Sequence, residues 1–176
     1  MGIFQKIIDG FRLTLTVEEE KAINDKIAVF NSAIHQMTGK YISLVEIDTF
    51  KGKWEQTYRE IKATRIPQNS PIFSAVQRFF QDYDHVADTF AAMNESFLAM
   101  NSLRCDSLLS DIDGKSLDKQ QRTVVLNDEP RTLVLAGAGS GKTLTIAGKV
   151  KYLCQVCGGA PEESQRIAFT TKSAQE

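Results

Sequence analysis

One stretch of eight residues combines three glycines with a terminal Lys-Thr pair, and this combination suits phosphate binding. Its spacing is that of the Walker A pattern, with alanine where the general pattern has its first glycine. The glycines let the backbone bend so that successive N–H groups converge on phosphate oxygens, which larger side chains would obstruct. The lysine then reaches the β- and γ-phosphates of a nucleotide, and the threonine hydroxyl ligates Mg²⁺. These residues are Ala136, Gly137, Ala138, Gly139, Ser140, Gly141, Lys142 and Thr143.

The flanking segments distinguish a phosphate site from a glycine-rich turn that happens to end in Lys-Thr. Residues 132–136 form a short apolar run typical of a buried parallel strand. A helix is predicted from 141 to about 156, and its N-terminus adds partial positive charge beside the loop. A strand before the loop and a helix after it are the context that a nucleotide-binding loop requires. We therefore predict a nucleotide-phosphate site, with Lys142 and Thr143 as catalytic residues and Thr143 as the metal ligand.

The region from residue 113 onward predicts the opening of an α/β fold. An Asp-Gly pair at 113 and 114 marks its boundary, and Ser116 is expected to cap the first helix. Two strands are too few for the sheet of a motor domain, so the parallel sheet is predicted to be incomplete. The predicted elements, in order, are a helix over 117–126, a strand over 132–136, a helix over 141–156 and a strand over 166–170.

The preceding region, residues 1–112, is predicted to be helical. Thr16 with Glu19 forms a capping-box pattern, and a serine and a glutamate at 43 and 46 repeat it. Ser70 followed by proline predicts a third helix start, after which apolar residues continue at helical spacing to about residue 112. These elements suit an antiparallel hairpin or small bundle, which we interpret as a helical accessory region.

Aromatic residues and methionines occupy many apolar positions of the third helical stretch. The favoured interpretation is a packed core between helices. The alternative is a surface that stacks nucleic-acid bases, but basic residues are not interleaved with these rings as such a surface would require. The residues concerned are Val76, Phe79, Tyr83, Val86, Phe90, Met93, Phe97 and Met100.

Three segments together resemble the start of the UvrD/Rep-type DNA helicases of superfamily 1. They are Gln-Gln-Arg-Thr-Val-Val at 120–125, the loop region 132–143, and Phe-Thr-Thr-Lys-Ser-Ala-Gln-Glu at 169–176. The resemblance covers residues 116–176, about a third of the chain. It implies that residues 113–176 are the truncated N-terminal part of a RecA-like P-loop ATPase domain that uses ATP and Mg²⁺. The helical region before it is similar in architecture to the accessory domain of helicase IV-like proteins.

The resemblance also implies roles for residues outside the loop. Gln121, 21 residues before Lys142, corresponds to the glutamine that pairs with the adenine edge and selects ATP over GTP. Without that resemblance it would be a solvated helix residue. Thr170 and Lys172 correspond to a motif that contacts the backbone of single-stranded DNA through a hydroxyl and a charge. Taken alone, they would be a strand end and an ordinary surface lysine.

The sequence departs from the family pattern at three positions. Thr171 stands where asparagine is usual, and Ser173 where alanine is usual. Leu144 follows the loop threonine where some relatives carry arginine. None of these changes removes the phosphate site, but Leu144 is expected to alter how a nucleotide is held.

Parts that complete a helicase motor do not follow the loop in this sequence. We find there no Asp-Glu pair to complete Mg²⁺ coordination, no arginine finger and no second motor domain. Because phosphoryl transfer depends on positioning and charge stabilisation, weak nucleotide binding and poor turnover are expected. The chain is therefore interpreted as a fragment of a larger helicase, whose missing remainder or a partner chain would complete it.

Three functions remain as alternatives at this point. The first is the ATP-binding N-terminal portion of an ATP-dependent helicase or translocase moving on single-stranded DNA. The second is a truncated adaptor or nucleotide-sensing protein whose helical region binds a protein partner. The third is another class of loop-containing NTPase, against which the position of Gln121 and the segment 169–172 argue.

Composition and charge argue against a disordered chain, a membrane-spanning protein and a protein that binds nucleic acid through a large overall charge. Apolar residues make up 42% and charged residues 24% of the chain, and the net charge is −1, so a DNA contact would have to be local. The apolar runs are too short to cross a membrane. The three cysteines, two of them in a Cys-x-x-Cys pair at 154 and 157, are expected to be reduced thiols without a metal, which predicts a cytoplasmic protein.

Overall fold

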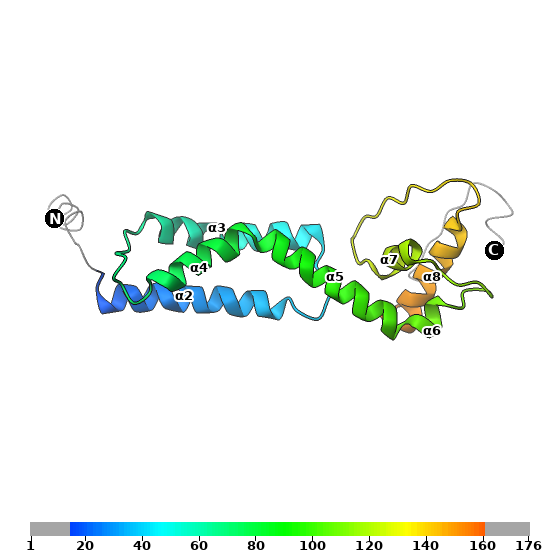
Figure 1. The fold of residues 1–176 in the computed structure, drawn as a ribbon, viewed down its shortest axis with the longest axis horizontal. Coiled ribbons are helices and arrows are strands. Elements are labelled where there is room, and N and C mark those ends of the chain that lie inside the picture. The colour runs from blue at the N-terminus through cyan, green and yellow to red at the C-terminus, as the bar shows by residue number, and fades with distance from the viewer. Residues whose placement is uncertain (1–14, 161–176) are drawn as a thin grey trace. The chain divides into compact units, whose positions relative to one another are not determined.

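The computed structural model describes residues 15–160, which fall into two compact units that divide between Ala92 and Met93 (Figure 1). The division falls within the helix α5 (Val86–Arg104). No helix in the described part of the chain is both long and apolar enough to span a membrane.

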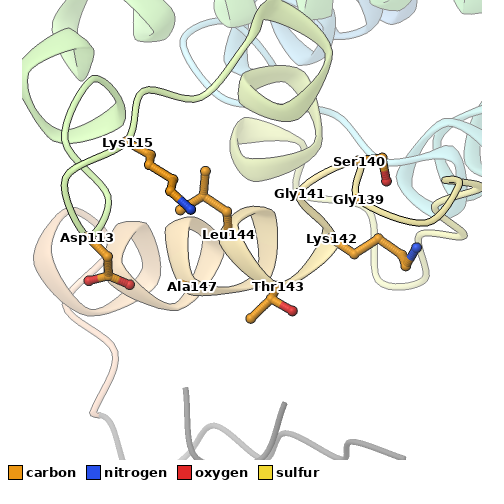
Figure 2. A pocket seen from close by; sticks show the side chains of 9 residues that line it. All are labelled: Asp113, Lys115, Gly139, Ser140, Gly141, Lys142, Thr143, Leu144 and Ala147. Atoms are coloured by element: carbon orange, nitrogen blue, oxygen red, sulfur yellow. The ribbon is translucent and has the colours of Figure 1, made fainter. Parts of the chain in front are cut away.

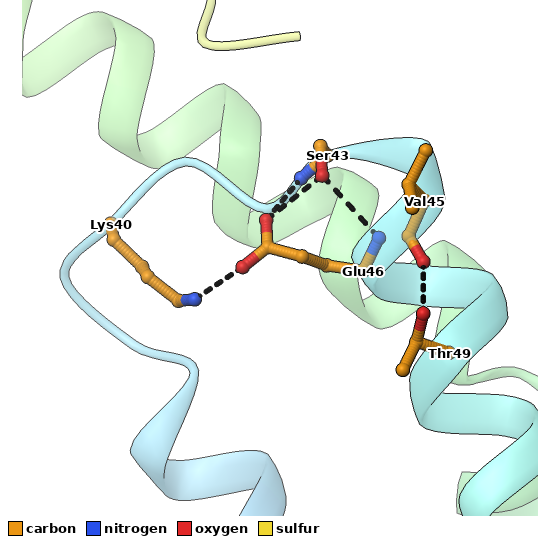
Figure 3. Close-up of polar contacts among 5 residues, drawn as sticks. All are labelled: Lys40, Ser43, Val45, Glu46 and Thr49. Carbon is orange, nitrogen blue, oxygen red and sulfur yellow. Dashed lines mark hydrogen bonds and ion pairs between the residues drawn. The ribbon is translucent and has the colours of Figure 1, made fainter. Parts of the chain in front are cut away.

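In the described part of the first unit the first two helices are α2 (Val17–Gln36) and α3 (Leu44–Ala63), and both predicted capping boxes are confirmed. At the start of α3, the Ser43 hydroxyl accepts from the Glu46 amide at 3.3 Å, and the Ser43 amide donates to the Glu46 carboxylate at 2.9 Å (Figure 3). Lys40 donates to the other carboxylate oxygen at 2.5 Å. This set of contacts lowers the pKa of Glu46, with the hydrogen bond from Lys40 as the largest cause.

The third helical stretch differs from its prediction at both its start and its length. Helix α4 (Phe73–Asp84) begins after Ile72, and no side chain caps it. The Ser70 hydroxyl instead donates to the Glu20 carboxylate at 2.7 Å, which ties the preceding loop to α2. The helix does not run unbroken to residue 112, because it is interrupted at His85 and again at Cys105.

The core of the first unit is aromatic, and Phe79 and Phe90 of the predicted core set are buried in it. Met100 of that set is 66% exposed, so its assignment to a core is wrong. Helices α2, α3 and α4 pack against one another and lie side by side in Figure 1. Phe30 is fully buried, and its ring meets Phe79 and Trp54 edge-on at centroid distances of 4.9 and 5.2 Å. Phe50 joins this group and packs edge-on against Phe90 at 5.1 Å. These rings are therefore core residues and are not available as a stacking surface for bases.

The second unit holds the short helix α6 (Asp106–Leu109), α7 (Lys119–Leu126) and α8 (Lys142–Gln155). Helices α7 and α8 pack together, and a glycine permits their close approach. A Cβ atom at Gly148 would lie 2.8 Å from Leu117 Cδ1 and 3.3 Å from Val125 Cγ2. The buried core consists of Cys105, Leu109, Ile112, Leu117, Val125, Leu126 and Tyr152.

The predicted α/β fold, a parallel sheet opening a RecA-like domain, is wrong for the described residues. Residues 132–136 have no regular secondary structure, and the side chains of Leu133 and Leu135 are 83% and 87% exposed. A buried strand needs a neighbouring strand for its N–H and C=O groups, and residues 15–160 contain only one isolated bridge, between Ile112 and Lys115. The second predicted strand, 166–170, lies outside the described residues.

Candidate functional site

The glycine-rich loop, residues 136–143, leads directly into helix α8. Gly139 and Gly141 adopt left-handed backbone conformations, with φ of 75° and 78°, which other residues rarely adopt. Gly141 is the N-cap, and the first helical bond runs from the Thr145 amide to the Gly141 carbonyl at 2.9 Å. The amides of the first turn therefore cannot be bonded within the helix. Together with the helix dipole they favour an anion at this end of α8.

The Lys142 ammonium lies against the backbone of its own loop. It donates to the Gly137 carbonyl at 2.6 Å and to the Ala136 carbonyl at 3.0 Å. The Ser140 hydroxyl also donates to the Gly137 carbonyl, at 2.8 Å. A charged phosphate oxygen is a stronger partner for an ammonium than a neutral carbonyl, so a phosphate group can displace these contacts.

A pocket of about 440 Å³ opens beside the loop and the first turns of α8 (Figure 2). Thr143 is one of the residues that line it. Asp113, which was marked from the sequence only as part of a boundary, and Lys115, which was assigned no role, also line it. The full lining is Asp113, Lys115, Gly139, Ser140, Gly141, Lys142, Thr143, Leu144 and Ala147.

Gln121 contacts the glycine-rich loop through its side-chain amide. Helix α7 begins at Asp118, and the Gln121 side chain completes a capping box by accepting from the Asp118 amide at 2.9 Å. Its Nε2 group donates to the Ser140 carbonyl at 3.1 Å. The predicted cap, Ser116, is therefore wrong by two residues, because a capping box needs a partner at its third helical position and Asp118 has one in Gln121. Gln121 also lines a second pocket of about 550 Å³ with residues 133–137.

Two basic residues, Lys149 and Arg122, hold α7 in place, and neither was assigned a structural role from the sequence. The Lys149 ammonium donates to the carbonyls of Asn127 and Val125 at 2.5 and 3.0 Å, which caps the C-terminal end of α7 from α8. Burial of this ammonium lowers the pKa of Lys149. Arg122 donates to the Asp106 carboxylate at 2.6 Å and to the Leu117 carbonyl at 2.9 Å. These contacts link residues distant in sequence, so no local pattern could predict them.

Two predicted site residues, Thr170 and Lys172, lie outside the described residues. Within residues 15–160 no group of three or more histidine, cysteine or acidic side chains is arranged to hold a metal ion. For Mg²⁺, the donor set assigned here is the Thr143 hydroxyl together with the phosphate oxygens that a nucleotide would bring. Cys154 and Cys157 are free thiols.

Comparisons with known proteins match the segment that holds the loop and Gln121. Residues 117–176 match the family model of the UvrD/REP helicase N-terminal domain. DNA helicase II of Salmonella typhimurium is 39% identical over 61 residues, which is 35% of this chain and 8% of that relative. The ATP-dependent DNA helicase Rep of Buchnera aphidicola is 44% identical over 57 residues, 32% of this chain and 9% of that protein.

One relative matches over both units. DNA helicase IV of Escherichia coli is 24% identical over 165 residues, which is 92% of this chain and 20% of the relative. No solved structure matches the chain significantly. The chain thus spans between 8% and 20% of the length of these three relatives. Residues 117–176 are therefore similar to the N-terminal domain of UvrD/Rep-type helicases.

Proposed function

We propose that the glycine-rich loop and the first turn of α8 bind the phosphates of ATP with Mg²⁺. The chain would then be the ATP-binding N-terminal portion of an ATP-dependent DNA helicase or translocase that moves on single-stranded DNA. The observation that carries this proposal is the convergence of Lys142, Thr143 and the N-terminus of α8 on one pocket.

In this proposal each residue of the loop has a physical role. The left-handed glycines 139 and 141 direct the backbone around the phosphates without side chains in the way. Lys142 exchanges its contacts with the Ala136 and Gly137 carbonyls for phosphate oxygens. Thr143 places its hydroxyl for Mg²⁺, which, when bound, neutralises charge on the β- and γ-phosphates.

Gln121 is proposed to recognise adenine. An amide can donate to N7 of adenine and accept from its N6 amino group, which distinguishes adenine from guanine. The same amide now bonds the Asp118 amide and the Ser140 carbonyl. Adenine binding would therefore compete with these contacts and would release the link between α7 and the loop.

Contact with DNA is proposed from the family alone. The three relatives described above are named as DNA helicases. Thr170 and Lys172 keep the proposed role of contacting the backbone of single-stranded DNA. The match to DNA helicase IV extends over both units, which supports a helicase accessory role for the helical unit over an adaptor role.

The proposal is tested by nucleotide binding to residues 1–176, measured by calorimetry with ATP and with GTP in the presence of Mg²⁺. We expect ATP to bind more tightly than GTP, and Lys142→Ala to weaken ATP about tenfold or more, because a charge-assisted bond is lost. Lys53→Ala, an exposed lysine on α3, is the matched control and should bind as the parent chain does. Absence of nucleotide binding in the parent chain would refute the proposal.

A further inference from the structure

The pocket beside the glycine-rich loop contains a second lysine, Lys115, which comes from a different part of the chain (Figure 2). Lys115 ends the turn formed by residues 111–115, between α6 and α7. The residues of the loop that share the pocket are Gly139 to Thr143. Two separate segments thus bring a lysine to the same pocket.

The 111–115 turn is fixed by several contacts. Ile112 and Lys115 exchange two backbone hydrogen bonds, at 2.8 and 3.0 Å. The Asp111 carboxylate accepts from the Gly114 amide at 3.0 Å, and the Ile112 side chain is buried in the core of the second unit. The Lys151 ammonium donates to the Asp111 carbonyl at 3.0 Å, which ties the turn to α8. The backbone that carries Lys115 is therefore held against the helix that follows the loop.

The Lys115 side chain extends from this turn alongside Leu144, the third residue of α8 (Figure 2). It is exposed, and within residues 15–160 it forms no ion pair. Asp113 lines the same pocket, but its carboxylate and the Lys115 ammonium extend from the turn in different directions (Figure 2). A cation beside the N-terminus of a helix is unfavourable, because that end carries partial positive charge. An anion bound between the Lys115 ammonium and the N-terminus of α8 would attract both and so replace this repulsion with attraction.

The two lysines approach the first turn of α8 from different sides. Figure 2 shows the Lys142 ammonium directed away from Lys115, toward the loop carbonyls that it contacts. Both residues nevertheless line the same pocket. An anion bound in this pocket would therefore have two lysines along the pocket wall.

We propose that Lys115 is a phosphate-binding residue of the nucleotide site and acts as a second cation beside Lys142. This inference rests on the proposed function, since it places the nucleotide phosphates at the first turn of α8. It assigns a binding role to a residue that lies before α7 and outside the glycine-rich loop.

The test uses residues 1–176 with Lys115→Gln, and with Lys119→Gln as matched control, because Lys119 is exposed in the same unit but does not line this pocket. Binding of Mg²⁺ with ATP, and with inorganic tripolyphosphate, is measured by calorimetry at two salt concentrations. Lys115→Gln should weaken both ligands about fivefold and reduce the salt dependence, as expected for one exposed charge contact. Lys119→Gln should stay within about twofold of the parent, and Lys115→Arg should restore binding.

The outcomes separate this inference from the proposed function. Unchanged binding in a folded Lys115→Gln variant, with the parent chain binding both ligands, overturns the inference alone. A loss for ATP without a loss for tripolyphosphate places Lys115 at the nucleoside and overturns the phosphate assignment. Absence of binding in the parent chain overturns the proposed function and this inference with it. Circular dichroism of each variant shows whether it has kept its fold.

Discussion

The side-chain amide of Gln121 donates to the main-chain carbonyl of Ser140 at 3.1 Å and so joins helix α7 to the glycine-rich loop. This close approach depends on the next residue, because a Cβ atom at Gly141 would lie 2.6 Å from the Gln121 Nε2 atom. Gly141 also has a φ of 78°. The left-handed backbone is thus the main requirement for glycine at this position, because the Gln121 amide is the end of a flexible side chain that can move aside only by giving up its contact with the loop.

Gly141→Ala should therefore destabilise the second unit, by about 1–2 kcal/mol for the left-handed conformation, with a further cost for displacing Gln121. Gly137→Ala is the matched control, because no atom lies within 4 Å of its Cβ position and its φ is not positive. We expect the control to leave the free energy of unfolding within about 0.5 kcal/mol of the parent. Hydrogen exchange of residues 119–155 measures both, and equal stability of the two variants would contradict the prediction.

A second prediction separates the two contacts of Gln121. Gln121→Glu can still accept from the Asp118 amide, but it cannot donate to the Ser140 carbonyl. It should speed hydrogen exchange in residues 136–141 and leave α7 protected. Gln121→Ala loses both contacts and should also destabilise α7 by about 1 kcal/mol, the usual contribution of an N-terminal cap. If the two variants show the same exchange in α7, the capping contact does not stabilise that helix.

Local patterns predicted the helices well, because their signals lie within a few residues of each other. Thr16 with Glu19, and Ser43 with Glu46, form the capping boxes that the sequence indicates. At Ser70 the hydroxyl accepts from the Ile72 amide at 3.4 Å in a turn before the helix, and it donates to Glu20, which is 50 residues away. A contact of that separation leaves no trace in local spacing.

The strand at 132–136 failed for a different physical reason. Its apolar run satisfies the local pattern for a buried strand, but strand structure also requires a partner for each N–H and C=O group. Local sequence cannot show whether that partner exists. The contact between Gln121 and the loop was not predicted from the sequence, because it depends on the packing of α7 against α8. Lys115 was missed because its position depends on the packing of Ile112 in the core.

A third prediction concerns the aromatic core of the first unit. Phe30 is fully buried and packs against Phe79, Trp54 and Phe50, so Phe30→Ala should cost about 3–5 kcal/mol of unfolding free energy. Val29→Ala, at a neighbouring position that is 60% exposed, is the matched control and should cost less than about 1 kcal/mol.

The readout is the fluorescence of Trp54, the one tryptophan in the chain, during chemical denaturation. Since the second unit has its own core, binding of ATP by Phe30→Ala should match that of the parent chain under conditions where both remain folded. A loss of nucleotide binding in this variant, with α7 and α8 still protected from exchange, would show that the first unit contributes to the site.

The last prediction follows from the ion pair between Asp106 and Arg122, whose atoms lie 2.6 Å apart. The hydrogen bond from Arg122, supported by Ser110, lowers the pKa of Asp106 below its ordinary value of 3.8. A lowered pKa in the folded state means that the pair stabilises the second unit above about pH 4, and that this contribution is lost as the pH falls through the folded-state pKa. The advantage of the parent over Asp106→Asn, measured by hydrogen exchange of α7, should therefore be constant near neutral pH and vanish at acidic pH. The control is Glu95→Gln, which removes an exposed carboxylate that forms no ion pair within residues 15–160. Its protection of α7 should depend on pH as that of the parent does. If the parent protects α7 better than Asp106→Asn by the same amount at every pH, the ion pair does not hold α7.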